Sequence, residues 1–191
     1  RMGGVDKPLL PLGNARVIDH VLTRLRPQVS RIAINANGDP ARYAEFGLPI
    51  LPDANDDRLG PLAGVLAGLD WAKREGGDAI ITVAGDTPFF PTDLTARLAG
   101  ARTAATPIAL AATPHPDKGN MRHPTFGVWP VSLRDALEVA LSEGVRKMVA
   151  WADRQGAATV VFEAGDIDPF FNLNTPDDYD AANALLAGNT L

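Results

Sequence analysis

The chain contains 191 residues, a length that suits one domain with a sizeable hydrophobic core. Its formal net charge of −5 argues against a nucleic-acid-binding face, and its lack of cysteine excludes disulfides, thiolate zinc sites and cysteine nucleophiles. No stretch approaches the roughly 18 apolar residues that a membrane span requires. We therefore expect a cytoplasmic protein that binds neither nucleic acid nor membranes.

The first quarter of the chain alternates helical and strand patterns. Apolar residues at helical spacing predict an amphipathic helix over 17–25. Residues 29–37 then alternate apolar and polar side chains, as a strand does. A short helix near 41–46 and a short strand over 48–53 are expected to follow.

The middle of the chain repeats this alternation with stronger signals. A helix is predicted from Pro61 to the glycines at 76–77, which are typical of a helix end. Residues 78–86 form a nearly continuous apolar run, which indicates a strand buried on both faces. Residues 91–100 begin with proline and end with glycine, the pattern of a further helix.

The second half of the chain predicts three strands and three helices. The strands cover 107–113, 125–131 and 158–164, and the helices cover 132–143, 145–155 and 176–186. Residues 113–124 are rich in Pro, His, Lys, Arg and Gly, and we expect a long mobile loop there. Strands that alternate with helices predict an α/β fold with a mostly parallel sheet, whose ligands bind beyond the carboxyl ends of the strands.

The chain opens with Arg-Met-Gly-Gly-Val-Asp-Lys, a candidate phosphate loop. Gly3 and Gly4 allow the backbone to approach a phosphate closely, and their amides supply hydrogen-bond donors. Arg1 and Lys7 add two cationic groups, which suit a polyphosphate. The alternative is a flexible arm with scattered charges, and this stretch alone supports both interpretations equally.

Asp86 follows the buried strand in the stretch Gly-Asp-Thr-Pro. An aspartate at this point lies at the carboxyl edge of the sheet, and carboxylate oxygens are the natural protein ligands of Mg²⁺. The alternative is a helix N-cap or an Asx-turn before Pro88. Because a loop with Gly, Arg and Lys accompanies this aspartate, we favour the metal interpretation.

Asn35 and Asp53 each end a short predicted strand. An amide and a carboxylate suit the recognition of a nucleobase edge, and a carboxylate accepts from the two N–H donors that guanine offers. Turn chemistry is the favoured alternative for these two residues taken alone. Gly60, Pro61 and Leu62 begin a helix with space for a phosphate or a flat ring, although close packing of the helix against the sheet is the favoured interpretation of this stretch alone.

Four polar residues in the second half are further candidates for binding an anionic substrate. Arg122 and His123 follow the expected loop, and Asn172 and Asn174 alternate so that both point to one side of an extended segment. Loop hydrogen bonding is the alternative for the two asparagines. Thr175 before a proline predicts the N-cap of the last helix.

Several of these stretches occur together in one order. They are Arg-Met-Gly-Gly-x-Asp-Lys, Asn-Ala-Asn, Leu-Pro-Asp, Gly-Pro-Leu-Ala-Gly, Asp-Thr-Pro, His-Pro-Thr and Asn-x-Asn-Thr-Pro. From Arg1 to about Ala182 the chain thereby resembles the molybdenum cofactor guanylyltransferases. The resemblance implies a three-layer, Rossmann-like nucleotidyltransferase fold. It also implies that GMP is transferred from GTP to the terminal phosphate of molybdopterin, with release of pyrophosphate.

The resemblance further implies a role for each candidate residue. Catalytic roles fall to Arg1, Lys7 and Asp86, with Lys7 and the backbone of Gly3 and Gly4 on the GTP phosphates and Mg²⁺ on Asp86. The nucleotide pocket is expected to include Asn35, Asp53, Gly60, Pro61 and Leu62. The molybdopterin side is expected to include Arg122, His123, Asn172 and Asn174.

In that family, Leu-Ala-Gly-Gly precedes the corresponding arginine at the end of a first strand. The resemblance therefore predicts a single nucleotidyltransferase domain over 1–191 that lacks this strand and the start of the Gly-rich loop. We expect a monomer with transient contacts to molybdoenzymes or their chaperones. The alternatives are a molybdopterin cytidylyltransferase, a sugar-phosphate nucleotidyltransferase and a non-catalytic nucleotide-binding module.

Overall fold

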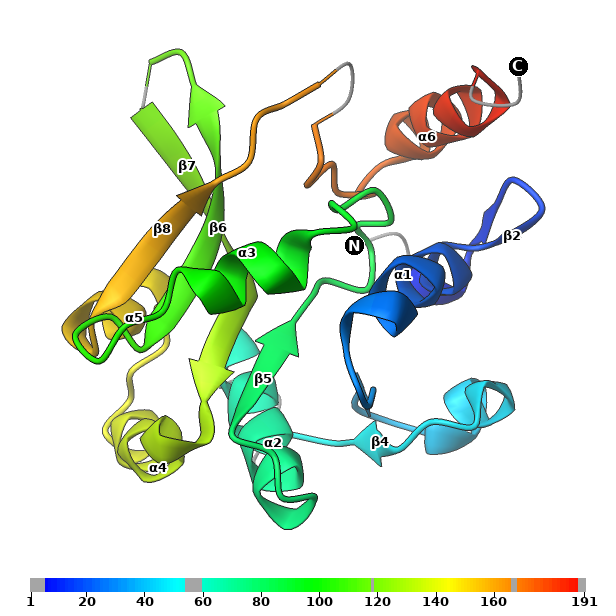
Figure 1. The fold of residues 1–191 in the computed structure, drawn as a ribbon. Coiled ribbons are helices and arrows are strands. Elements are labelled where there is room, and N and C mark those ends of the chain that lie inside the picture. The colour runs from blue at the N-terminus through cyan, green and yellow to red at the C-terminus, as the bar shows by residue number, and fades with distance from the viewer. Residues whose placement is uncertain (1–5, 54–59, 118, 166–167, 189–191) are drawn as a thin grey trace.

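The computed structural model describes residues 6–53, 60–117, 119–165 and 168–188 (Figure 1). The helices are α1 (Val17–Leu25), α2 (Pro61–Arg74), α3 (Leu94–Gly100), α4 (Arg134–Ser142), α5 (Met148–Arg154) and α6 (Pro176–Gly188). Short 3₁₀ helices are η1 (Lys7–Leu9), η2 (Arg26–Gln28), η3 (Pro40–Phe46) and η4 (Val131–Leu133). The strands are β1 (Pro11–Leu12), β2 (Ala15–Arg16), β3 (Ile34–Asn35), β4 (Ile50–Leu51), β5 (Ala79–Thr82), β6 (Ile108–His115), β7 (Gly119–Pro130) and β8 (Ala157–Val161).

The main sheet has four strands among the described residues, in the order β5-β7-β6-β8. β7 is antiparallel to both β5 and β6, and β8 is parallel to β6. Three of the four strands therefore point in one direction and β7 opposes them, which confirms a mostly parallel sheet. β3 and β4 form a separate parallel pair, and β1 and β2 form a small hairpin.

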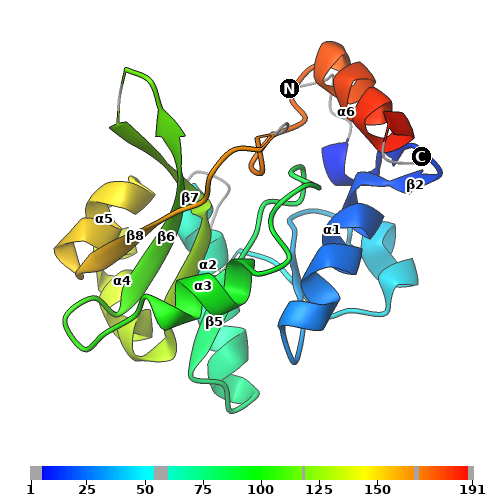
Figure 2. The same cartoon turned by 45° about the horizontal axis from the view of Figure 1, so that its top comes forward.

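Helices cover both faces of the main sheet, which gives the predicted three layers (Figures 1 and 2). One face packs against α2, α4 and α5 through Ile108, Leu110 and Trp129. The other face packs against α3 and part of α1 through alanines of β6 and two residues of β7. β6 is apolar from Ile108 to Ala112 and fully buried there, because helices cover it on both sides.

α1 shows how the sequence pattern determines this packing. Its apolar positions recur every three or four residues, and all of them are buried: Val17, Ile18, Val21, Leu22 and Leu25. The two sides of this stripe face different partners. Val21 and Leu25 contact the main-sheet cluster, whereas Ile18 and Leu22 pack with Tyr43 beside β3 and β4. α1 therefore joins the β3–β4 pair to the rest of the molecule.

Three predicted elements differ from the structure. The strand expected over 78–86, buried on both faces, is limited to Ala79–Thr82, which is only partly buried and lies at an edge of the described sheet. The strand expected over 29–37 is reduced to Ile34–Asn35, which pairs with β4. The mobile loop expected over 113–124 is wrong in its described part. β6 continues to His115 and β7 begins at Gly119, so the two strands pair as a hairpin that projects from the sheet (Figure 1). Backbone pairing there outweighs the turn-forming composition.

The two ends of the described chain pack against each other. Leu12 and Val17 form a small core with Leu173, Tyr179 and Ala182. The backbone N–H of Gly13 donates to Asn183 Oδ1 at 2.8 Å, and α6 lies beside β1 and β2 (Figure 2). This packing fixes the segment that contains Lys7. Within the described ranges, no helix is long and apolar enough to cross a bilayer.

We expect Leu110→Ala to lower the free energy of unfolding by about 2–5 kcal/mol, because it removes a large side chain from a fully buried position between two layers. Urea unfolding followed by circular dichroism measures this change. Val139→Ala on α4 is the control, because the Val139 side chain is exposed and its loss should cost less than about 1 kcal/mol. Equal losses in the two variants would contradict the assigned core.

Candidate functional site

Lys7, Asp86 and Asn174 lie together although they are far apart in the sequence. Lys7 Nζ donates to Asn174 Oδ1 at 2.6 Å and lies 4.0 Å from Asp86 Oδ2. The Lys7 and Asp86 side chains are only 20% and 24% exposed, so this ion pair is partly shielded from water. We call these three residues the lysine cluster. It unites one residue expected at the nucleotide phosphates, one expected at a metal and one expected at the second substrate.

The turn after β5 places Asp86 at this position. The chain leaves the sheet beyond Thr82 and turns at Gly85 and Asp86. Pro8 lies against Gly85, where an added Cβ would come within 3.2 Å of Pro8 Cγ. The backbone N–H of Leu173 donates to the carbonyl oxygen of Asp86 at 3.0 Å. The N-terminal and C-terminal segments therefore meet at this one turn.

Burial raises the pKa of the Asp86 carboxyl, because the charged form loses solvation. The Lys7 ammonium opposes this rise, as do hydrogen bonds from Thr87 and from the backbone. A carboxylate that is partly desolvated and faces a single cation at a strand end is typical of a functional site.

The N-terminus of α6 orients Asn174. Asp178 Oδ2 accepts the backbone N–H of Asn174 at 2.8 Å and that of Thr175 at 2.7 Å. The N–H of Asp178 in turn donates to Thr175 Oγ1 at 3.2 Å, which completes a capping box and confirms the predicted N-cap. These hydrogen bonds lower the pKa of Asp178, so the cap keeps its charge.

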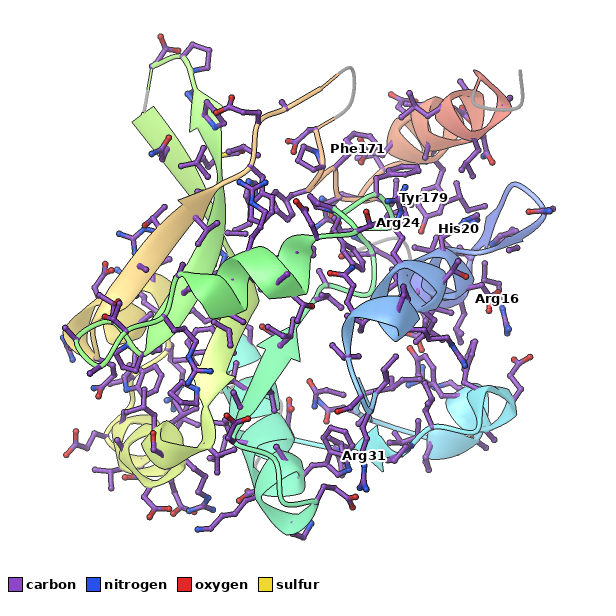
Figure 3. The ribbon with its side chains drawn as sticks, viewed as in Figure 1. Arg16, His20, Arg24, Arg31, Phe171 and Tyr179 are labelled. Atoms are coloured by element: carbon purple, nitrogen blue, oxygen red, sulfur yellow. The ribbon has the colours of Figure 1, made fainter. Side chains whose placement is uncertain are left out.

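Tyr179 connects α6 to the backbone of Lys7. Its side chain points from α6 toward the N-terminal segment (Figure 3), and its hydroxyl donates to the Lys7 carbonyl oxygen at 3.2 Å. Burial raises the pKa of this phenol, and the negative charge of Asp86 raises it further. Tyr179 is therefore protonated at neutral pH and remains a hydrogen-bond donor.

A second polar group, the asparagine cluster, consists of Asn35, Asn37 and Asp53. Asn35 Nδ2 donates to Asp53 Oδ1 at 2.9 Å and to the carbonyl oxygen of Leu51 at 2.8 Å. Asn37 Nδ2 donates to Asp53 Oδ2, and the N–H of Asp53 donates back to Asn37 Oδ1, both at 2.9 Å. The Asp53 carboxylate is thus oriented by one amide on each oxygen and has no cationic partner among the described residues.

α2 begins beside the asparagine cluster. Gly60 caps this helix with φ +68°, and Pro61 occupies its first turn. The Leu62 side chain is fully buried in the core, so a ligand at this position would meet backbone rather than side chain. A Cβ added at Gly64 would overlap Asn35 Oδ1. The small residues of this stretch therefore allow the helix to pack closely against Asn35.

Arg122 and His123 lie on opposite faces of β7, as neighbouring strand residues do. Arg122 Nη1 donates to Asp153 of α5 at 2.5 Å. His123 Nε2 lies 2.9 Å from Thr113 Oγ1, and its ring lies 4.5 Å from that of Phe170. Burial lowers the pKa of His123. Of the two, His123 lies toward the segment that leads to Asn172 and Asn174.

The other site residues predicted from the sequence lie partly within and partly outside the described structure. Asn172 and Asn174 are both exposed and flank the buried Leu173, which is consistent with the predicted alternation. Arg1, Gly3 and Gly4 lie outside the described residues. Sequence reasoning missed Tyr179 and Asp178, although the Thr-Pro-Asp-Asp stretch contained the signal of a capping box for Asp178. The position of Tyr179 depends on the tertiary packing of α6.

A cavity of about 390 Å³ lies apart from these clusters. Its lining includes Arg26, Arg31, Trp71 and Glu75. Arg31 lies at the other end of the molecule from Tyr179 (Figure 3). The cavity shares no residue with either polar cluster, so the candidate site is the polar surface at the strand ends. No group of three or more acidic, His or Cys side chains capable of holding a metal occurs among the described residues.

Sequence comparison assigns the chain to a family. The MobA-like NTP transferase domain family matches residues 1–159. The chain belongs to this family. A molybdenum cofactor guanylyltransferase from Mesorhizobium japonicum is 46% identical over 100% of this chain and 92% of that protein. One from a Bradyrhizobium species is 47% identical over 98% of this chain and 88% of that protein. These alignments extend past residue 159 and so include Asn174.

Solved structures share the fold. The molybdopterin-guanine dinucleotide biosynthesis protein A from Archaeoglobus fulgidus superposes with a TM-score of 0.72 at 20% identity, covering 98% of this chain and 94% of that one. The 4-diphosphocytidyl-2C-methyl-D-erythritol synthase from Anaerococcus prevotii superposes with a TM-score of 0.76 at 15% identity, covering 96% and 91%. Both confirm the predicted nucleotidyltransferase fold.

We expect Gly64→Ala to displace Asn35 and thereby to weaken its hydrogen bonds to Asp53 and Leu51. The ¹H–¹⁵N spectrum should show shifted resonances for the Asn35 side-chain amide and for the Asp53 backbone. Alanine stabilises a helix by about 1 kcal/mol relative to glycine, and the weakened hydrogen bonds of Asn35 should cost about the same amount. The free energy of unfolding should therefore change little.

Gly68→Ala is the matched control for this variant, because it makes the same change in the same helix. Its added Cβ would meet Cδ1 of Ile80, the flexible end of a side chain that can move aside. The Asn35 and Asp53 resonances should stay in place in Gly68→Ala. Unshifted resonances in Gly64→Ala as well would show that Gly64 is not in contact with Asn35.

Proposed function

We propose that this protein transfers GMP from GTP to the phosphate of molybdopterin and so forms molybdopterin guanine dinucleotide and pyrophosphate. Relatives that are 46% and 47% identical over nearly the whole chain carry the name molybdenum cofactor guanylyltransferase. The single structural observation that best supports the proposal is the lysine cluster. It combines a cation, a carboxylate and an amide at the turn that follows β5.

The reaction is an in-line displacement at the α-phosphorus of GTP. A phosphate oxygen of molybdopterin forms the new bond to this phosphorus, while the bond to the β-phosphate bridging oxygen breaks and its electrons leave with pyrophosphate. The nucleophile is already anionic, so the protein needs no general base. Its task is to position two anions and to neutralise the charge that develops on the leaving group. Lys7 supplies positive charge for that purpose.

The lysine cluster also fits a divalent cation, which nucleotidyltransferases generally use. Asp86 contributes a carboxylate oxygen next to the exposed Asn174, and oxygen ligands of this kind suit Mg²⁺. One carboxylate is sufficient, because Mg²⁺ commonly keeps several waters and binds substrate phosphates. When bound, Mg²⁺ would supply charge neutralisation at the phosphates. We propose Asp86 as the residue that holds it.

The asparagine cluster suits the guanine base. Guanine presents a ring N–H and an exocyclic amine on one edge, and a carboxylate accepts both. Asn35 and Asn37 orient the Asp53 carboxylate, and their neutral amides leave its charge uncompensated. Each carboxylate oxygen can accept more than one hydrogen bond, so Asp53 keeps acceptor capacity. We propose that Asp53 selects GTP over CTP.

We assign the molybdopterin side to the exposed segment that carries Asn172 and Asn174, with His123 toward the same side of the sheet. Asn174 contacts Lys7, the proposed partner of the nucleotide phosphates, and this contact supports the assignment. Arg122 faces the other side of β7 and is already paired with Asp153, so its position gives this role less support.

We expect Asp86→Asn to lower the rate of pyrophosphate release at least about 100-fold, because the amide cannot neutralise or hold a cation as a carboxylate does. The folded protein should not be less stable, because the pKa of Asp86 is raised by burial and the charged form is therefore the costly one.

The sign of the pH dependence follows from that raised pKa. The free energy of unfolding of the wild type should fall relative to that of Asp86→Asn as the pH rises from the ordinary pKa of aspartate through the raised pKa of Asp86. Thermal melts at a series of pH values measure this difference.

Asp78→Asn is the matched control for activity, because Asp78 is exposed at the opposite end of β5, and this variant should keep full activity. Full activity of Asp86→Asn at ordinary Mg²⁺ would refute the role of Asp86.

The decisive assay for the proposed function is pyrophosphate release with molybdopterin and either GTP or CTP. We expect release with GTP, much slower release with CTP, and none without molybdopterin. Asp53→Ala should lower kcat/KM for GTP by about 10- to 100-fold, because it removes the acceptor of the guanine N–H groups. Equal use of CTP would instead favour a cytidylyltransferase, and no release with either nucleotide would favour a binding module.

A further inference from the structure

Arg42, on η3, contacts segments that lead to both polar clusters. Its Nη1 lies 2.7 Å from Asp6 Oδ2, and its Nη2 donates to the carbonyl oxygen of Asn37 at 2.7 Å. Its Nε donates to the carbonyl oxygen of Asp39 at 3.2 Å. One guanidinium therefore engages three acceptors from two separate segments of the chain.

The two segments that Arg42 contacts each carry residues of the candidate site. Asp6 immediately precedes Lys7 of the lysine cluster. Asn37 belongs to the asparagine cluster and exchanges two hydrogen bonds with Asp53. Arg42 thus forms a short side-chain connection between the residue before Lys7 and the residue that holds Asp53.

The Asp6 end of this connection is shielded from water. Asp6 Oδ2 is buried, and Arg42 Nη1, which lies 2.7 Å from it, is the cation that balances its charge. The Tyr43 side chain also hydrogen-bonds to Asp6, and burial together with this bond raises the pKa of the Tyr43 phenol to about 12. An ion pair with a desolvated oxygen is costly to break, because the remaining charge stays buried.

The Asn37 end depends on a glycine. Gly38 has φ +85°, a conformation that side chains other than glycine rarely adopt. An added Cβ would lie 3.2 Å from Arg42 Nη2, so the backbone passes close to the guanidinium. This turn brings the Asn37 carbonyl oxygen within hydrogen-bonding distance of Arg42. The single side-chain nitrogen of a lysine could not take the places of both Nη1 at Asp6 and Nη2 at the Asn37 carbonyl oxygen.

We propose that Arg42 is a positioning residue that sets the distance between Lys7 and Asp53, and hence between the phosphate-binding and base-binding ends of the nucleotide site. This inference rests on the proposed function, which assigns the two clusters to the two ends of one GTP. A ligand that spans both clusters needs this distance to be correct, whereas a ligand that fills only one cluster does not.

Calorimetric titration with two probes tests this distinction. GTP spans both clusters, and inorganic triphosphate reaches the lysine cluster alone; both are measured with Mg²⁺. Arg42→Ala should bind GTP about tenfold more weakly than the wild type and triphosphate within about twofold. Arg42→Lys should resemble Arg42→Ala. Unchanged GTP affinity, or an equal loss for both probes, would overturn the proposal.

Arg97 on α3 provides a matched control. Its side chain is 42% exposed against 41% for Arg42, it pairs with Asp93, and its Nη2 donates to a backbone carbonyl oxygen, that of Val161. Arg97→Ala therefore removes similar interactions away from both clusters. It should leave the affinities for GTP and triphosphate unchanged.

Hydrogen exchange in the nucleotide-free protein tests the connection independently of binding. The amides of Leu9 and Leu10 bond to the carbonyl oxygens of Asp6 and Lys7, and the Asp53 amide bonds to Asn37. All three should exchange faster in Arg42→Ala than in Arg97→Ala, and equal rates would overturn the proposal. If the wild type binds no GTP, the proposed function fails, whereas these exchange rates still decide whether Arg42 connects the two segments.

Discussion

The partly shielded ion pair between Lys7 and Asp86 is the interaction on which the candidate site depends. It holds the N-terminal segment at the end of β5, and Asn174 completes it from the C-terminal segment. In the proposed reaction, Lys7 and Asp86 exchange each other for ligands. Asp86 would face a metal cation in place of the Lys7 ammonium, and Lys7 would face a phosphate oxygen in place of the Asp86 carboxylate. Nucleotide and metal can therefore replace the pair without leaving either charge unbalanced.

The two carboxylates of the site differ in their surroundings, and this difference separates their proposed roles. Asp86 is partly buried and faces the Lys7 ammonium, and this burial raises the pKa of its carboxyl. Asp53 is held by the neutral amides of Asn35 and Asn37, which orient it without compensating its charge. An aspartate next to a cation suits exchange with a metal and phosphates. An aspartate held by amides suits fixed hydrogen bonds to the edge of a base.

Sequence reasoning was most successful where local pattern and packing agree. The stripe of α1 and the apolar run of β6 each predicted an element that the structure contains. Asp86 and Lys7 were candidates because a carboxylate after an apolar strand suits Mg²⁺ and a lysine after glycines suits phosphates, although a turn and a flexible arm were open alternatives. Residues 113–124 were mispredicted because their composition favours turns, whereas long-range pairing of β6 with β7 decides their structure.

Contacts that depend on tertiary structure could not be predicted from local sequence patterns. Arg122 and His123 are adjacent in sequence and were both expected at the second substrate, but β7 directs them to opposite faces. Leu62 belongs to a motif that suggests a ligand, yet its side chain fills the core. Arg42 has no local pattern at all. Its importance follows only from the meeting of η3 with the residues before Lys7.

The separation of 167 residues between Lys7 and Asn174 has a consequence for synthesis of the protein. A ribosome makes the chain from its N-terminus, and the capping box at Thr175 and Asp178 emerges after all the described strands. The main sheet ends at Val161, so it can form while α6 is still missing. A nascent chain therefore lacks the lysine cluster. The cluster can form only after translation has passed Asn174.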